Sequence, residues 1–528
     1  MSDRLAPSLT TPEPSPSLAR SAGVLALGNA VSRVLGLARV VVIADYFGAT
    51  GAVSAFGLAS RVPTMIYDLL VGGMLSAALV PVLSEYAEPD RRDELWRAAG
   101  AVLSFVTVIL AAVVLAIELL AEPIAYLLGT GLTPELQMVT ARSLRIIAPT
   151  VLVFGCAGFV TALLYALNRF TFPALAAAVF NLGIVISAPL LAGRLDIYSL
   201  SVGILAGSVA QLLIQLPGLK GARIRFFWDL RHPALRRIGK LYLPVAIGLA
   251  VGQLQVVIDG NLATRTGERS VAWMQSATTL REMPLGLVSV AISLAALPAL
   301  SRSASDGNWA GYKRTLARGL RLVIVLTLPA AVGLAVLAVP AVRLIFEHGE
   351  FTSLDTVWTS RALWGYIPGL LFAAVDWPLN YAYYARQDTR TPTVVGFAAV
   401  AVYLAVALAL LRSLGMLGLV LADSAKHGFH ALAMLVLLRR DVGNLGGQHV
   451  LGTTLKALLA SAIMGAMMLL AVPVLGGWIV GSTLWHELLQ VALAGGLGVV
   501  VYYGMLVLLR VDELKMVREL VTRRRIAG

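Results

Sequence analysis

The sequence predicts an all-α polytopic membrane protein with about 14 transmembrane helices, and three observations support this prediction. First, hydrophobic residues make up 58% of the 528 residues and charged residues only 13%, whereas a soluble domain carries about 25% charged residues. Second, hydrophobic runs of 20 residues or more recur from residue 22 to residue 510, and each can cross roughly 30 Å of hydrocarbon. Third, Lys and Arg gather in every second loop between these runs, as the positive-inside rule expects.

The hydrophobic runs give the expected helices in chain order. The predicted spans cover approximately residues 22–47, 53–84, 95–128, 134–167, 170–192, 198–218, 238–260, 270–300, 314–345, 355–384, 391–411, 415–438, 452–475 and 485–510. Residues 1–21 are rich in Pro and Ser, which predicts a disordered tail before the first helix. The first run contains Arg33 and Arg39 and continues past them, so we interpret it as a transmembrane helix rather than a signal peptide.

The distribution of basic residues predicts that both termini are cytoplasmic. An even number of helices places the termini on one side, and 29 of the 42 Lys and Arg residues lie in the tails or in the loops of that side. The opposite loops contain only Arg194, Arg265, Arg269 and Arg412. The positive-inside rule therefore accounts for the net charge of +13, and we expect no nucleic acid partner.

The first half of the chain resembles the second half. ALVPVLSEY (78–86) aligns with AALPALSRS (295–303), and ARSLRIIAP (141–149) aligns with SRALWGYIP (360–368), with nearly the same offset along the chain. Because each copy comprises six helices, both copies enter the membrane in the same orientation. This pattern predicts two parallel six-helix repeats around an axis along the membrane normal, as in a two-lobed transporter, followed by two additional C-terminal helices.

The repeat divides the chain into six expected parts. These are a disordered cytoplasmic tail (1–21), an N-lobe of helices 1–6 (22–218), a basic cytoplasmic linker (219–237), a C-lobe of helices 7–12 (238–440), two extra helices (441–510) and a basic cytoplasmic tail (511–528).

Nine basic residues lie within the predicted spans, where each costs on the order of 3 kcal/mol at a helix centre. They must therefore face water, acidic partners or the headgroup region. Arg33 and Arg39 flank the middle of the first span, roughly 9 Å apart along the helix axis and about 120° apart around it. Both can line one wide cavity, and surplus arginine in such a cavity suits an anionic substrate, because guanidinium groups bind phosphate bidentately.

Charges in two further spans leave two interpretations open. Arg61 and Asp68 lie on one face of the second span, and Arg281 and Glu282 lie in the eighth. These residues either line the same cavity or form ion pairs that hold helices together. For the basic residues, the partners considered are Asp45, Asp68, Asp259 and Glu282.

The twelfth span contains an acid–base cluster of Asp423, Lys426, His427 and His430. This cluster either relays protons or forms a self-contained packing network. The sequence contains no GxxxxGK[ST], HExxH or GxSxG motif, and no loop exceeds about 22 residues. We therefore predict a transporter rather than an enzyme, with no metal site and no cofactor, driven by Na⁺ or H⁺ or by the membrane potential.

Several segments are similar to the MurJ/MviN family of lipid II flippases. SRVLGLARVVVIADYFGAT (32–50) resembles the opening of that family, and LREMPLGLVSVAISLAALPALSR (280–302), FEHGEFTSLDT (346–356) and YYARQDTRTPT (383–393) resemble its second half. The resemblance covers about residues 22–440. It implies the 14-helix fold of the multidrug/oligosaccharidyl-lipid/polysaccharide exporter superfamily and a location in the bacterial cytoplasmic (inner) membrane.

The family resemblance also implies a function and partners. It implies export of lipid II, the lipid-linked peptidoglycan precursor, or of a similar undecaprenyl-pyrophosphate-linked glycan from the inner to the outer leaflet by alternating access. Membrane lipids and the cell-wall synthesis machinery would be further partners.

The resemblance suggests which residues form the site. The family's two first-helix arginines match Arg33 and Arg39, and a basic residue of its second helix matches Arg61. With Arg281, these residues would hold the pyrophosphate of the headgroup. The family's acids match Glu282 and Asp259, which would set the polarity of the cavity or bind a cation, as would the acids Asp68 and Asp423.

The chain departs from the family pattern at several positions. Charged residues of the family are replaced by Ser54, Tyr67 and Thr279, and the eleventh span lacks the Asn and Asp associated with sodium binding in some members. These departures leave two alternatives to lipid II export. One is an exporter of the same fold for another lipid-linked oligosaccharide, and the other is a degenerate paralogue that transports nothing.

Overall fold

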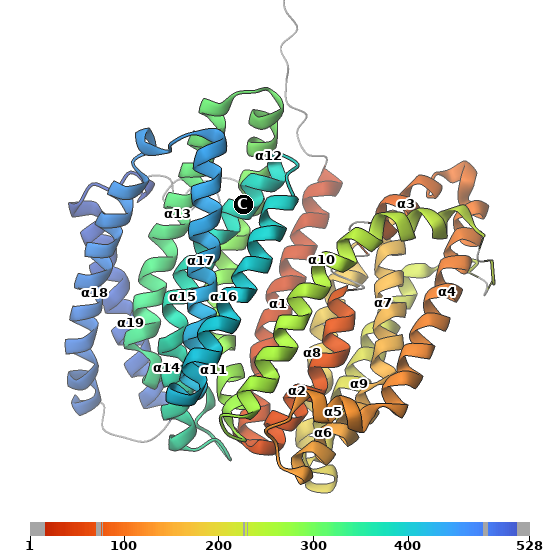
Figure 1. The fold of residues 1–528 in the computed structure, drawn as a ribbon, viewed down its shortest axis with the longest axis horizontal. Helices are drawn as coiled ribbons and strands as arrows, with labels where there is room; N and C mark the ends of the chain where they lie inside the picture. Colours follow the sequence, from red (N-terminus) through yellow and green to blue (C-terminus); the bar gives the residue numbers. More distant parts are fainter. Residues whose placement is uncertain are drawn as a thin grey trace, which may run out of the picture. The chain divides into compact units, whose positions relative to one another are not determined.

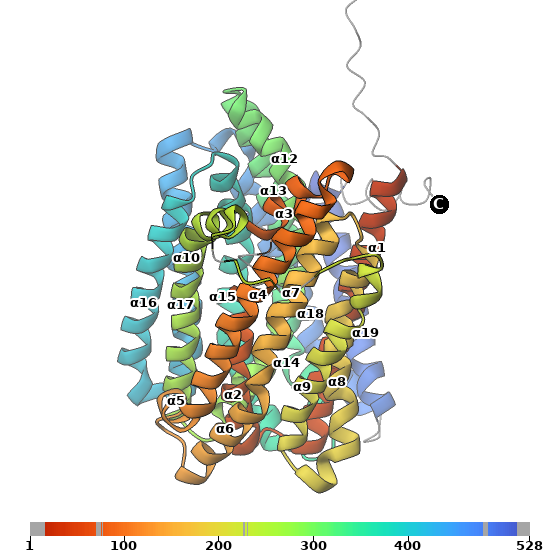
Figure 2. The same ribbon diagram turned by 90° about the vertical axis from the view of Figure 1, so that its right-hand side faces the viewer.

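The computed structural model describes residues 16–69, 75, 78–224, 227–229, 231–478 and 484–514. Within these residues the chain is built from α-helices with short 3₁₀ and π segments, and no β-strand is present. The predicted all-α fold class is thereby confirmed. Figures 1 and 2 show the helices in two views at right angles.

The helix boundaries follow the predicted spans closely. The helices are α1 (Pro16–Phe47), α2 (Gly51–Tyr67), α3 (Val80–Tyr86), α4 (Arg92–Leu119), α5 (Ala121–Leu128), α6 (Pro134–Ile147), α7 (Pro149–Ala166), α8 (Thr171–Leu195), α9 (Tyr198–Leu213), α10 (Pro233–Thr264), α11 (Ser270–Pro284), α12 (Val290–Ser305), α13 (Trp309–Val336), α14 (Ala338–Phe346), α15 (Ser353–Ala385), α16 (Arg390–Leu414), α17 (Met416–Val442), α18 (Val450–Trp478) and α19 (Leu484–Leu508).

Ten helical segments of the described chain are long and apolar enough to cross a membrane. The four predicted spans without such a segment are 53–84, which includes residues that are not described, and 238–260, 355–384 and 415–438. The last three fall on α10, α15 and α17, which are 32, 33 and 27 residues long but carry charged side chains. The count of 14 transmembrane helices therefore stays a prediction.

The N-terminal tail is shorter than predicted. Residues 1–15 lie outside the described residues, but α1 begins at Pro16, so residues 16–21 are helical rather than disordered. Proline is favoured in the first turn of a helix because the missing N–H would have no partner there. At the other end of the chain, only residues 511–514 of the predicted basic tail are described, and Val511 and Glu513 are buried.

The internal repeat predicted from the sequence is visible in the helix boundaries. The numbering offset that aligns residues 78–86 with 295–303 also aligns the first and last residues of α4 with those of α13, and each helix has 28 residues. The offset that aligns residues 141–149 with 360–368 likewise aligns the first and last residues of α8 with those of α16, and each helix has 25 residues. The turns that flank α8 and α16 correspond by this second offset as well. Asn168 and Gln387 have φ of 58° and 59°, and Asp196 and Gly415 have φ of 48° and 55°.

Contacts divide the chain into two compact units. Unit 1 comprises residues 1–42, 59–121 and 141–250, and unit 2 comprises residues 43–58, 122–140 and 251–528. Both units draw on α1, α2 and α10, so their boundaries differ from the predicted lobes 22–218 and 238–440, which stay predictions. In unit 1, α9 packs against α7 and α8, and α7 also packs against α4. In unit 2, α15, α16 and α17 pack together, and α18 and α19 pack near α13 (Figure 1).

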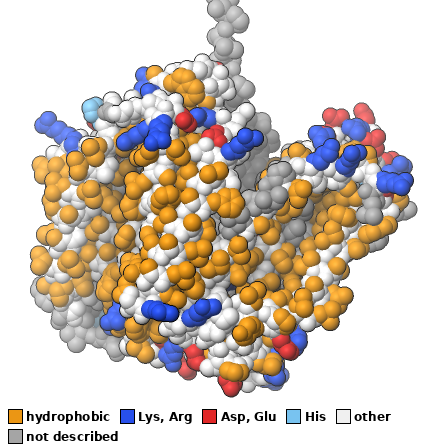
Figure 3. Space-filling view, viewed as in Figure 1, with side chains coloured by type: hydrophobic (Ala, Val, Ile, Leu, Met, Phe, Trp, Pro, Cys, Tyr) orange, Lys and Arg blue, Asp and Glu red, His pale blue; other side chains and the backbone are white. Residues whose placement is uncertain are grey.

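The surface of each unit fits a lipid environment. Hydrophobic side chains cover the middle of the helices, and Lys and Arg side chains gather towards the helix ends (Figure 3). On α18 and α19, Leu451, Leu470, Val499 and Val500 are about 70% exposed. Lipid tails would solvate such side chains, whereas water would not.

Side-chain hydrogen bonds fix the corner between α14 and α15. Thr352 and Asp355 form a capping box at the start of α15. In the preceding loop, burial would raise the pKa of Glu347, but hydrogen bonds donated by Thr356 at 2.6 Å and Ser353 at 2.7 Å, with the charge of Arg343, hold that pKa below its usual value. The loop therefore keeps a charged carboxylate at the helix end.

Glycines bring α8 and α9 into close contact. A Cβ atom on Gly183 would lie 2.3 Å from the carbonyl oxygen of Gly203 and 2.5 Å from the Cα atom of Gly207. Gly203 and Gly207 form a small-xxx-small pattern, which lets helix backbones approach closely in membranes.

We expect Gly183→Ala to destabilise unit 1 because the added methyl group meets backbone atoms that cannot rotate away. Overpacking of this kind costs about 1–3 kcal/mol. Gly193→Ala on the same helix is the matched control, since a Cβ atom there has no neighbour within 4 Å. Thermal unfolding in detergent, followed by size-exclusion chromatography, should give a lower midpoint for Gly183→Ala only. Equal midpoints for the two variants would contradict the close approach.

Candidate functional site

The eight predicted site residues fall into both units. Unit 1 contains Arg33 and Arg39 on α1, Arg61 on α2 and Asp68 directly after α2. Unit 2 contains Asp259 on α10, Arg281 and Glu282 on α11, and Asp423 on α17. Each set is described within its own unit. That both sets line one cavity stays a prediction.

An asparagine holds Arg39 in unit 1. Nη1 of Arg39 donates to Oδ1 of Asn181 at 3.4 Å, and Nδ2 of Asn181 donates to the carbonyl oxygens of Ser32 at 3.3 Å and Ala177 at 3.1 Å. Nε of Arg39 is buried and has no hydrogen-bond partner among the described residues. Arg33 is exposed on the same helix. The sequence analysis did not single out Asn181, although an amide inside the apolar span 170–192 is a signal.

The second helix presents one basic residue and an aromatic contact. Arg61 is half-buried and Asp68 is exposed. Tyr67, which stands where the family carries an arginine, packs against Phe154 with 4.6 Å between ring centroids, and Phe154 contacts Phe180 at 5.3 Å. Tyr67 therefore makes an aromatic packing contact within unit 1.

An ion-pair network links three helices of unit 2. Asp423 accepts hydrogen bonds from Arg281 of α11 and, at 2.7 Å, from Lys426 of its own helix α17. The Arg281 guanidinium also lies over the ring of Tyr366 on α15, 4.7 Å from its centroid. The Arg281, Lys426 and Asp423 side chains are only 11–16% exposed. Arg281 thus forms an ion pair with an acid that was not among the partners considered from the sequence, and its role in substrate binding stays a prediction.

Asp259 is bound by a tyrosine of α16. The hydroxyl of the fully buried Tyr403 donates to Oδ1 of Asp259. Tyr366 lies close to the charges of Asp259 and Asp423, so the two acids belong to one polar region of unit 2. Glu282 is exposed at the end of α11.

The acid–base cluster of α17 divides between two acidic partners. Nδ1 of His430 lies 2.7 Å from Oδ1 of Asp376 on α15, and these two side chains are 13% and 16% exposed. His427 lies 3.8 Å from Asp423 instead. Asp376 was not among the residues singled out in the sequence, although a carboxylate between Val375 and Trp377 in a predicted span is a visible signal.

The remaining two departures from the family make local structural contacts. Ser54 is buried, and its hydroxyl accepts a hydrogen bond from the backbone N–H of Ala272 at 3.3 Å within unit 2. Thr279 donates to the carbonyl oxygen of Gln275 at 2.9 Å. Neither contact requires a charge.

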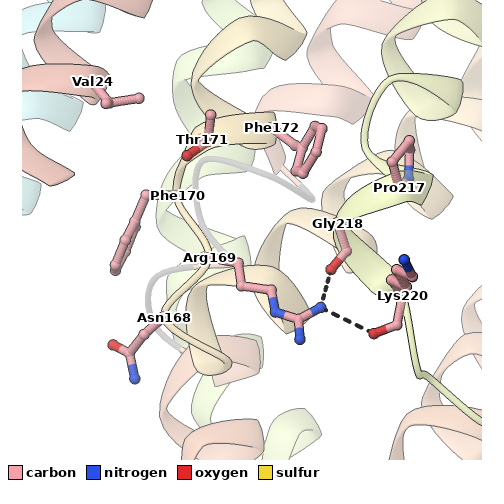
Figure 4. Close-up of a pocket in the computed structure, with 9 residues that line it drawn as sticks. All are labelled: Val24, Asn168, Arg169, Phe170, Thr171, Phe172, Pro217, Gly218 and Lys220. Atoms are coloured by element: carbon pink, nitrogen blue, oxygen red, sulfur yellow. Dashed lines mark hydrogen bonds between the residues drawn. The ribbon is translucent and has the colours of Figure 1, made fainter.

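Two of the cavities among the described residues are of interest outside these networks. One, of about 530 Å³ in unit 1, is lined by Arg169 and Lys220, but Arg169 donates to the carbonyl oxygens of Gly218 and Lys220 (Figure 4). Arg169 therefore serves chiefly to join two loops. The other, of about 710 Å³ in unit 2, is apolar and lies between α13, α18 and α19, with Leu334, Val491, Gly495 and Val499 among its lining residues.

We expect Asp423→Asn to destabilise the protein strongly, because Arg281 and Lys426 would lose the one carboxylate that they share. Removing one partner of a buried pair costs about 3–5 kcal/mol. Glu85→Gln is the control, because its pair with Arg237 is about half-exposed and such pairs contribute at most about 1 kcal/mol. The measurement is thermal unfolding in detergent. Adding Lys426→Met to Asp423→Asn should recover part of the loss, and equal midpoints for the Asp423 and Glu85 variants would refute the prediction.

Comparison with known proteins gives a consistent result over most of the chain. The family model for the lipid II flippase MurJ matches residues 43–489. A probable lipid II flippase MurJ of Vibrio cholerae is 31% identical over 521 residues, covering 95% of this chain and 98% of the relative. A lipid II flippase MurJ of Burkholderia cenocepacia is also 31% identical, covering 69% of this chain and 73% of the relative.

Solved structures support the fold. A lipid II flippase MurJ in an inward closed conformation has a TM-score of 0.77 at 24% identity, covering 94% of this chain and 99% of that structure. An inward-facing multidrug resistance transporter of the MATE family has a TM-score of 0.68 at 13% identity, covering 79% of this chain and 96% of that structure. Together with the family match over most of its length, these likenesses identify the chain as a member of the lipid II flippase MurJ family.

Proposed function

We propose that this protein flips lipid II from the inner to the outer leaflet of the cytoplasmic membrane by alternating access. The observation that carries the proposal is the similarity to a probable lipid II flippase over 95% of this chain and 98% of that relative. The protein is a multi-pass membrane protein of a transporter family, and it needs no catalytic group to move its substrate. The excess of Lys and Arg on one side supports cytoplasmic termini.

The arginines of unit 1 are the best candidates for binding the pyrophosphate. Arg33, Arg39 and Arg61 lie on α1 and α2, and the described residues around Arg39 supply an amide rather than a carboxylate. Arg281 in unit 2 is already paired with Asp423, so it has less net charge to offer an anion. A pyrophosphate attracts a guanidinium group such as that of Arg39, whose side-chain acceptor among the described residues is a neutral amide.

The apolar cavity of unit 2 is a suitable site for the prenyl tail. It lies against α18 and α19, the two helices outside the repeat, and has a volume of about 710 Å³. Its lining is dominated by aliphatic side chains and glycines, so burial of hydrocarbon there is favourable. The cell-wall synthesis machinery would supply lipid II on one side of the membrane and use it on the other.

Rescue of a bacterium depleted of its own lipid II flippase tests the function. We expect this protein to restore growth and outer-leaflet lipid II, and Arg33→Ala/Arg39→Ala to lose at least about tenfold in flipping, equivalent to about 1.4 kcal/mol of headgroup binding. Arg194→Ala is the control, because Arg194 is exposed in the last turn of α8. Lipid II is counted in each leaflet. Full rescue by the double variant would remove the basis for arginine binding, and failure of the inserted wild-type protein would favour another lipid-linked glycan.

A bulky side chain in the apolar cavity should slow flipping without unfolding the protein. Gly495 lines the cavity, and a Cβ atom there lies 3.9 Å from its nearest neighbour, on Leu337. We expect Gly495→Phe to fill the cavity and reduce the flipping rate severalfold. Gly496→Phe is the matched control, because Gly496 is exposed and faces open space. Equal rates for the two variants in proteoliposomes would show that the tail passes elsewhere.

A further inference from the structure

The structure separates the buried charges of unit 2 into two groups. Arg281 and Lys426 share the carboxylate of Asp423. Arg281, which keeps its charge at any working pH, forms a triad with Lys426 and this carboxylate. His430 belongs to a separate pair with Asp376.

We propose that the Asp376–His430 pair is a proton-binding site that couples flipping to a proton gradient. This inference rests on the proposed function and adds a second ligand, H⁺, to it. Histidine is the side chain that proteins most often use to bind and release a proton, and the ring of His430 contacts a carboxylate of a neighbouring helix.

The position of the pair places it well inside the predicted membrane span. Asp376 lies nine residues before the end of α15 at Ala385, and His430 lies twelve residues before the end of α17 at Val442. At 1.5 Å per residue these distances are roughly 14 and 18 Å. The pair therefore lies away from the basic helix ends, and ionisable side chains inside membrane spans mark ion pathways and proton relays in transporters.

The hydrogen bond determines which nitrogen takes up the proton. A carboxylate only accepts hydrogen bonds, so Nδ1 of His430 carries the hydrogen that it donates to Asp376. Nε2 is then the free base. It faces α16 at Gly396, where even an added Cβ atom would lie 4.0 Å away. Uptake of H⁺ at Nε2 forms an N–H bond and changes the pair's charge from −1 to 0. Release of H⁺ reverses the step, and the proton comes from water on one side and leaves to water on the other.

Charged and titratable groups of the neighbouring helices surround the pair. Helix α17 contributes Lys426 and His427, α11 contributes Arg281, and α15 contributes Tyr384 near Asp376. Helix α16 brings Gly396, and its Tyr403 is bound to Asp259. Helices α12 and α13 pack on α15 and α17 through apolar clusters that include Leu300, Leu320 and Val323. Asp423 is occupied by two cations, so His427 beside it has no unpaired acid.

Proteoliposomes with fluorescent lipid II test the coupling while valinomycin and K⁺ clamp the membrane potential. We expect an imposed pH gradient to accelerate flipping by the wild-type protein severalfold and an enclosed pH-sensitive dye to report proton movement with it. His430→Gln and Asp376→Asn should flip without responding to the gradient. His427→Gln, one turn away on α17, is the matched control and should respond as the wild type does. A wild-type rate that ignores the gradient, or a full response in His430→Gln, would overturn the proposal.

A lipid-independent measurement separates this inference from the proposed function. In nanodiscs of phosphatidylethanolamine and phosphatidylglycerol, the ¹⁵N-histidine NMR spectrum should contain a signal that changes with pH, is absent in His430→Gln and shifts in Asp376→Asn. Such a signal in a protein that flips no lipid II would leave the proton site standing and reject the proposed substrate. If the signal that His430→Gln removes does not change with pH in the wild-type protein, the proton site is rejected whatever the protein transports.

Discussion

The cost of placing charge in hydrocarbon is the constraint on which this structure depends. Each charged side chain in a membrane span must find water or a partner, since insertion at a helix centre costs on the order of 3 kcal/mol. In unit 2 the constraint is met by pairing, as Asp423 joins α11 to α17 and Asp376 joins α15 to α17. In unit 1, Arg39 is held by the neutral amide of Asn181. The two units therefore offer different charges to a ligand: an arginine beside a neutral amide in unit 1, and side chains in ion pairs in unit 2.

The two halves share helix boundaries but differ in the side chains at corresponding positions. Helices α8 and α16 match at both ends when the two repeats are aligned. In the same alignment, Asp423 and Lys426 of the second half correspond to Ile204 and Gly207 of the first. Gly207 lies in the close contact between α8 and α9, so the first half keeps tight backbone packing where the second half has an ion pair. Duplication therefore fixed the helices, and single residues set what each half can bind.

The sequence predicted the helices better than it predicted the contacts between them. Span ends follow hydrophobic runs, which are local, so α8 at Thr171–Leu195 lies close to the predicted 170–192. The contact of Asp423 with Lys426 was also predictable from the sequence, because residues three apart share a helix face. Pairs such as Asp376 with His430 join positions 54 residues apart. Such pairs depend on how each helix is rotated about its axis, and hydropathy does not specify that rotation.

The difference between the halves bears on how two ligands could act together in one transport cycle. On the proposals made above, a pyrophosphate supplies negative charge to Arg33 and to Arg39, which is held by a neutral amide among the described residues of unit 1. A proton removes the net negative charge of the Asp376–His430 pair in unit 2. Each ligand therefore lowers the cost of the uncompensated charge in one half of the protein. Two ligands that favour the same conformation for this reason are coupled thermodynamically, and the coupling needs no direct contact between their sites.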